Sequence, residues 1–260
     1  MTVKYHGPIL AALVGAAMAA PALAADLYNN GPYITHPNAP HTTLGTANVS
    51  QLQNITLGDT TLGFTVSPGF RLADDFTIPS GQNWTISSVA VYAYSTNFVT
   101  PPSGANLRIW SGDPGAGGAL VYDGSGASTL LSATFDALRI AASVNAGPPF
   151  SDAARRVFNV EIGVPNVNLG SGQYWVDWQV NPTAGATSAF NPPVTIHNQG
   201  NTAAGGVARQ WTGTAWTAQL TQGTSLNPVD LPFVVKGTPE PSTLALLLIA
   251  GGSLLSLRRR

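Results

Sequence analysis

Two adjacent carboxylates, Asp74 and Asp75, are the first residues in the sequence whose chemistry suggests catalysis. Glycosidases use a pair of carboxyl groups that face each other across a sugar. The run 71–78 alternates like a β-strand, however, and neighbouring residues of a strand point to opposite faces. Without a bulge the two groups cannot form a facing pair. Glu161 has no catalytic partner nearby in sequence, and the motifs Gly-x-Ser-x-Gly and His-Glu-x-x-His are absent. We therefore predict no catalytic residues.

Asp74 has a second interpretation, because it shares its alternation with Leu72, Phe76 and Ile78 and would face an apolar core. A carboxylate on such a face needs hydrogen-bond donors, an arginine or a cation to offset the loss of water. Calcium is the only cofactor this position suggests, since Ca²⁺ binds carboxylate and carbonyl oxygens. Hydrogen bonds from backbone N–H groups or an arginine are the simpler alternative, and we favour them.

The six tryptophans all lie between residues 84 and 216, and they could contact a carbohydrate. Trp175 shares a predicted strand face with Asp177, whose carboxylate could bond sugar hydroxyls. Trp211 and Trp216 bracket a short turn. We take these four residues as candidate ligand contacts for a polysaccharide. The competing interpretation is that the tryptophans fill the core, as aromatic residues commonly do.

Several kinds of site are excluded by what the chain lacks. The sequence contains no cysteine, so thiol catalysis, zinc fingers and disulfides are ruled out. His36, His41 and His197 show no zinc-binding pattern. A formal net charge of -1 provides no basic surface for nucleic acid.

These candidate residues must be positioned by β-strands, because short alternating runs separated by Gly, Pro, Asn and Ser fill the centre of the chain. We predict an all-β domain over residues 66–238, a two-sheet antiparallel β-sandwich or jelly roll. In the run 174–180, Val176, Trp178 and Val180 share one apolar face. The run 84–94 changes phase and predicts a β-bulge near Ser87. Residues 25–65 are expected to form an extended arm or edge strands.

The N-terminal segment, residues 1–24, has the features of a secretory signal peptide. Lys4 is followed by an apolar stretch over 9–20 that is too short to span a bilayer comfortably. Ala22 and Ala24 supply the small residues that signal peptidase accepts, and we predict cleavage between Ala24 and Ala25. The alternative is an uncleaved anchor.

The C-terminal segment, residues 239–260, combines three features in a fixed order. Pro239-Glu240-Pro241 precedes an apolar run over 244–257, predicted to be a single transmembrane helix, and Arg258-Arg259-Arg260 ends the chain. Positive charge beyond an apolar helix holds that end in the cytoplasm. The order resembles the PEP-CTERM sorting tail. That resemblance implies recognition by an exosortase in the inner membrane of a Gram-negative bacterium, followed by release or attachment at the cell surface. A plain tail anchor is the alternative.

A second resemblance covers much of the body. The runs 70–86, 108–110, 172–178 and 231–233 are similar to a group of secreted bacterial β-sandwich proteins that often carry PEP-CTERM tails. The match carries over no catalytic residues. It implies a β-sandwich and an exported location.

Only 9% of the residues are charged, which suits a neutral, hydrated polymer better than an ionic partner. We therefore expect an exported protein of the cell surface or exopolysaccharide matrix, structural or carbohydrate-interacting and not catalytic. One alternative is a secreted hydrolase with a site assembled from distant residues. Another is an ice-surface binder, which the irregular threonine spacing disfavours.

Overall fold

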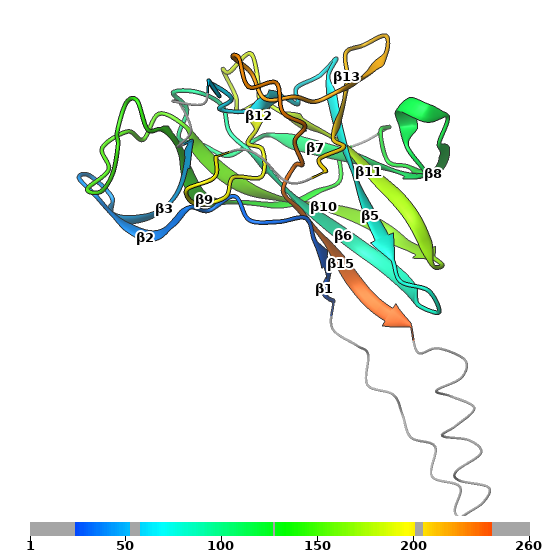
Figure 1. Cartoon of the computed structure of the whole chain (residues 1–260). Helices are drawn as coiled ribbons and strands as arrows, with labels where there is room; N and C mark the ends of the chain where they lie inside the picture. The colour runs from blue at the N-terminus through cyan, green and yellow to red at the C-terminus, as the bar shows by residue number, and fades with distance from the viewer. Residues whose placement is uncertain (1–23, 53–57, 127, 201–204, 241–260) are drawn as a thin grey trace, which may run out of the picture.

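A computed structural model describes residues 24–52, 58–126, 128–200 and 205–240, which form an all-β protein (Figure 1). The one helical element in these ranges is a short 3₁₀ turn, Pro114–Ala116. None of the described residues belongs to a helix long and apolar enough to cross a membrane. The predicted signal segment 1–23 and the predicted helix over 244–257 lie outside the described residues.

Two large sheets account for most of the strands. The seven-stranded sheet has the order β1-β15-β6-β10-β9-β3-β2. Its strands are β1 (Ala25–Asn29), β2 (His36–His41), β3 (Gly45–Leu52), β6 (Asn83–Ala93), β9 (Leu130–Ala141), β10 (Arg156–Leu169) and β15 (Phe233–Glu240). The segment 25–65 therefore supplies both edges of this sheet, β1 at one side and β2 at the other.

The six-stranded sheet has the order β14-β13-β5-β11-β7-β8. Its strands are β5 (Arg71–Ile78), β7 (Gly104–Ser111), β8 (Ala119–Asp123), β11 (Gly172–Asn181), β13 (Arg209–Trp211) and β14 (Trp216–Ala218). A small two-stranded sheet pairs β4 (Phe64–Thr65) with β12 (Phe190–Asn191).

The two large sheets contribute to one apolar core. Val176, Trp178 and Val180 of β11 are buried together with Val160 and Ile162 of β10. The predicted alternation of β11 is thus confirmed, because its apolar face is the one turned toward the other sheet. Trp178 is the largest fully buried side chain, and its Nε1 donates to Asn191 Oδ1 at 3.3 Å.

One strand pair departs from the antiparallel arrangement expected from the sequence. β3 pairs in parallel with β9, with Val49 opposite Leu138. Parallel neighbours need a long connection, and many residues separate these two strands in the chain. Elsewhere the register shows the predicted irregularity: Lys236 lies opposite Ser88 and Gly237 opposite Ile86, so Ser87 is an extra residue on β6.

Strand boundaries differ from the sequence pattern in two ways. The sequence pattern predicts strands over 130–135 and 156–162, whereas β9 and β10 run several residues beyond Phe135 and Ile162. The pattern also predicts a strand over 194–197, but this segment is irregular chain with one isolated bridge at Ile196. Val194 and Thr195 are nevertheless buried. A short apolar run of this kind predicts burial but does not distinguish a strand from irregular chain.

Both ends of the described chain leave the domain from neighbouring strands. Ala25 pairs with Gly237, so β1 and β15 lie side by side at one edge. β15 continues through Glu240, two residues beyond Thr238, where the predicted β-domain ends. Figure 1 shows the free ends of β1 and β15 at the opposite end of the molecule from β12 and β13.

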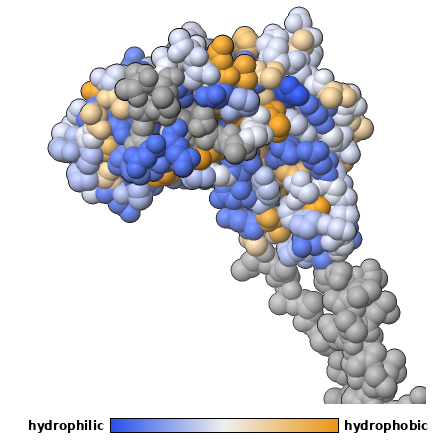
Figure 2. Space-filling view, viewed as in Figure 1, coloured by the Kyte–Doolittle hydropathy of each residue, from blue (hydrophilic) through white to orange (hydrophobic). Residues whose placement is uncertain are grey.

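The surface in the same view is largely hydrophilic, with small separate apolar groups (Figure 2).

Candidate functional site

A groove of three adjoining compartments lies beside the small β4–β12 sheet. The first compartment has a volume of about 470 Å³, and its lining includes Thr65, Phe190, Gln210, Gln219 and Gln222. The second, about 240 Å³, shares Gly63, Phe190 and Gln222 with the first. The third, about 250 Å³, shares Thr60, Leu62 and Arg155 with the second. The shared walls place the three compartments in a row, and we call them together the Gln222 groove.

Segments far apart in sequence are held together to form this groove. Gln210 Nε2 of β13 donates to Thr65 O of β4 at 2.6 Å. Thr60 N donates to Gln222 O at 3.2 Å, and Gln222 N donates to Thr61 Oγ1. Gly63 lies where a Cβ atom would come within 2.8 Å of the Tyr94 hydroxyl, so no larger residue fits there without movement.

Arg139 supports the floor of the groove from inside the protein. Its side chain is fully buried, and Nε donates to Leu62 O and Nη2 to Thr61 O, both at 2.9 Å. Nη1 donates to Ser50 Oγ and Thr195 Oγ1, both at 2.8 Å. Burial lowers the pKa of Arg139 to about 10, against an opposing effect of Tyr94 and Asp59, so the guanidinium is still charged at neutral pH.

The lining of the Gln222 groove is mostly uncharged and able to form hydrogen bonds. In the first two compartments, amides and threonine hydroxyls line the groove together with Phe190, Tyr94 and several leucines, whereas the third compartment is lined mainly by apolar residues. Among the described lining residues the charged groups are Asp59 and Arg155. A glycosidase would need two carboxylates facing each other across the sugar, and these linings contain one.

Trp175 and Asp177, two of the predicted ligand contacts, are buried, so the prediction of exposed contacts is wrong at both positions. They lie on the outer face of the six-stranded sheet, with 3% and 0% of their surface exposed. Asp177 is enclosed by Arg71 and Trp110, and the loop after β7 extends across the same face. Asp113 of this loop forms an ion pair with Arg209 of β13 at 2.7 Å. Because β5 and β11 lie between β7 and β13 in the sheet, the loop has to cross over them.

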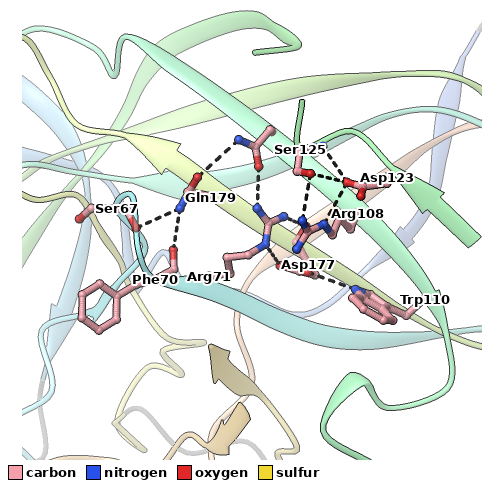
Figure 3. Close-up of polar contacts among 10 residues, drawn as sticks. Ser67, Phe70, Arg71, Arg108, Trp110, Asp123, Ser125, Asp177 and Gln179 are labelled. Atoms are coloured by element: carbon pink, nitrogen blue, oxygen red, sulfur yellow. Dashed lines mark hydrogen bonds and ion pairs between the residues drawn. The ribbon is translucent and has the colours of Figure 1, made fainter. Parts of the chain in front are cut away.

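Asp177 belongs to a buried structural network instead (Figure 3). Its Oδ1 accepts from Arg71 Nε at 2.5 Å, and its Oδ2 accepts from Trp110 Nε1 at 3.1 Å. Arg71 Nη1 also donates to Asn106 Oδ1 at 2.7 Å. Burial raises the pKa of Asp177, while the charge of Arg71 opposes that rise. The side chains of Asp177, Arg71, Trp110 and Asn106 are thus hydrogen-bonded to one another, which is typical of a structural ion pair.

Trp211 and Trp216 keep part of their surface exposed. They are cross-strand partners on the β13–β14 hairpin, and their ring centroids are 5.7 Å apart. They are not among the residues that line the Gln222 groove. The structure therefore places all four predicted contacts on the six-stranded sheet but does not bring them together into one open site.

Asp74 is buried among hydrogen-bond donors. Its Oδ2 accepts from Asn30 Nδ2 at 2.9 Å and from Leu231 N at 2.7 Å, and its Oδ1 accepts from Asp75 N at 2.9 Å. Burial raises the pKa of Asp74 well above its ordinary value. Calcium needs a cage of oxygen atoms, whereas these neighbours present N–H groups. We therefore do not propose a calcium site at Asp74.

The histidines form no metal site in the described part of the chain, where no group of three or more His, Cys, Asp or Glu residues is placed to hold an ion. His36 and His197 are in contact, with ring centroids 4.9 Å apart. His41 is buried, and its Nδ1 accepts from the backbone N–H groups of Thr43 and Leu44.

The predicted processing sites lie at the limits of the described chain. Ala24 and Ala25 are exposed at the start of β1. Pro239 and Glu240 form the end of β15, where Glu240 Oε1 accepts from Thr85 Oγ1 at 2.6 Å. Ala22, Pro241 and Arg258–Arg260 lie outside the described residues.

The sequence alone does not indicate which residues line the groove. Asp59, Phe190 and Gln222 come from three distant segments, and none belongs to a motif with its own spacing. Low charge was the one usable signal, since it indicated a neutral binding surface without locating it.

No family model matches this chain, and no curated protein or solved structure matches it either. The function therefore has to be inferred from the geometry of the groove and from the two chain ends.

Proposed function

We propose that this protein is an exported, non-catalytic glycan-binding protein and that the Gln222 groove holds the sugar chain. The observation that supports the proposal is the lining of the first two compartments, which combines amides, hydroxyls and aromatic rings with a single charged group, Arg155. Amide and hydroxyl groups can both donate to and accept from sugar hydroxyls. The face of an aromatic ring offers the apolar surface on which a sugar's C–H groups pack.

The chain ends support an exported location in our proposal. A signal peptide over 1–24 and a PEP-CTERM tail over 239–260 would bring the protein to signal peptidase and exosortase at the inner membrane, and then to the surface or exopolysaccharide matrix. In Figure 1 the strands that lead to both ends lie opposite β12 of the groove. A domain held by its tail would then present the groove away from the membrane. We further propose that the two packed sheets belong to the sandwich or jelly-roll architectures.

Glycan binding is tested by Gln222→Ala. The side chain is exposed and lies where the first two compartments meet, so we expect a folded protein with about tenfold weaker binding of a neutral oligosaccharide, one or two hydrogen bonds being lost. Titration calorimetry against a panel of neutral gluco-, manno- and galactooligosaccharides measures the effect. Gln173→Ala, an exposed glutamine at the start of β11, is the matched control and should bind as the wild type does. Failure of the wild-type protein to bind any member of the panel would refute the proposal.

Export is tested by deleting Arg258–Arg260 from the full-length chain. If the arginines hold the C-terminus in the cytoplasm for processing, the deletion should shift the protein from the surface fraction to the membrane or the periplasm. Immunoblotting of fractionated cells measures the distribution. An unchanged surface fraction would count against the sorting proposal while leaving glycan binding intact.

A further inference from the structure

Asp59, a lining residue of the third compartment of the Gln222 groove, carries a buried carboxylate oxygen without a hydrogen-bond partner. Asp59 lines this compartment and has 3% of its surface exposed. Its Oδ1 accepts from Thr61 N at 2.8 Å, whereas its Oδ2 has no hydrogen-bond partner. Leaving a buried charged acceptor unbonded costs free energy, so this atom calls for an explanation.

We infer that Asp59 Oδ2 accepts a hydrogen bond from a hydroxyl of an uncharged sugar unit in the third compartment, and that the three compartments hold consecutive units of one chain. This inference rests on the proposed function and specifies the ligand. The lining residues shared at Phe190 and Leu62 make the three compartments neighbours in one row. Two compartments of nearly equal volume, about 240 and 250 Å³, are consistent with a repeated occupant.

The charges around the third compartment select a hydroxyl over the alternatives. Arg155 lines the compartment, and Arg139 is close enough for its pKa to be raised by Asp59. These two cations disfavour an ammonium group on the ligand. A uronic acid would place its carboxylate beside that of Asp59, and like charges repel. A neutral sugar hydroxyl satisfies the free oxygen without either conflict.

The inference is tested with Asp59→Asn in the full domain. Asparagine keeps the Oδ1 atom that accepts from Thr61 N, but its NH₂ group replaces the free acceptor. We expect about tenfold weaker binding of a neutral trisaccharide by calorimetry, since a hydrogen bond to a charged group is lost. The melting temperature should rise, because an unbonded buried charge has been removed. Asp26→Asn, an exposed aspartate of β1, is the matched control and should change neither quantity.

Ligand length and charge give the second readout. Affinity should increase from disaccharide to trisaccharide and then level off, and glucosamine or galacturonic acid oligomers should bind at least tenfold more weakly than neutral ones. The inference is overturned if Asp59→Asn binds like the wild type, if its melting temperature falls together with binding, or if the glucosamine oligomers bind best. Absence of all sugar binding by the wild-type protein would instead overturn the proposed function, and these results are distinguishable.

Discussion

Replacing Asp177 with alanine should lower the free energy of unfolding by about 3–5 kcal/mol, because a buried ion pair loses one partner. Arg71 would remain with 7% of its side chain exposed and without its carboxylate. Trp110 Nε1 would also lose the oxygen that accepts its hydrogen bond. Urea unfolding at neutral pH, followed by tryptophan fluorescence, measures the loss.

Asp123→Ala is the matched control for this prediction. Asp123 also accepts from an arginine of the same sheet, Arg108 Nε at 3.0 Å, but 46% of its side chain is exposed. An exposed ion pair contributes about 0.2–1 kcal/mol, so this variant should remain nearly as stable as the wild type. Equal losses in the two variants would show that the Arg71–Asp177 pair is not desolvated in solution, contrary to the structure.

Replacing Arg139 with methionine should cost about 3 kcal/mol, because two buried carbonyl groups lose their donors at about 1–3 kcal/mol each. Methionine fills much of the same volume, so the cost comes mainly from the unsatisfied oxygens of Thr61 and Leu62. Leu62 lines the groove and Thr61 precedes it in the chain, so binding of neutral oligosaccharides should weaken as well. Urea unfolding and calorimetry on the same samples measure both effects.

Arg156→Met provides the comparison for Arg139. The guanidinium of Arg156 lies 5.7 Å from the centroid of the Phe135 ring on a half-exposed surface. A contact of this kind is worth about 0.5–1 kcal/mol, and Arg156 is not among the residues that line the groove. If the two methionine variants were equally stable and bound sugars equally well, Arg139 could not be the support of the groove floor.

The strand pattern was predictable from the sequence wherever one face of a strand meets the core. β5 begins and ends where the alternation predicted, and the bulge at Ser87 followed from the change of phase in 84–94. Each of these features is set by residues within a few positions of one another. The ends of β9 and β10 were missed, because pairing with a neighbouring strand extends a strand beyond its apolar run.

Whether Trp175 and Asp177 are exposed depends on distant parts of the chain, which the alternation within their own strand does not show. Trp175 and Asp177 lie on the outer face, as alternation requires, yet both are buried, and the loop joined to Arg209 extends across that face. An outer face is exposed only if no distant segment packs over it. Asp74 shows the same dependence, because its donors Asn30 and Leu231 lie far from it in the chain.

The sequence by itself determined the all-β class, the inward face of β11 and the low charge of any binding surface, since these follow from composition and local periodicity. The location of the groove was decided only by the tertiary structure. Asp59, Phe190 and Gln222 meet because β4 pairs with β12 and Thr60 bonds to Gln222, and such contacts arise from the packing of the whole chain. The lack of a hydrogen-bond partner at Asp59 Oδ2 also results from that packing. The spacing of residues along the chain does not predict it.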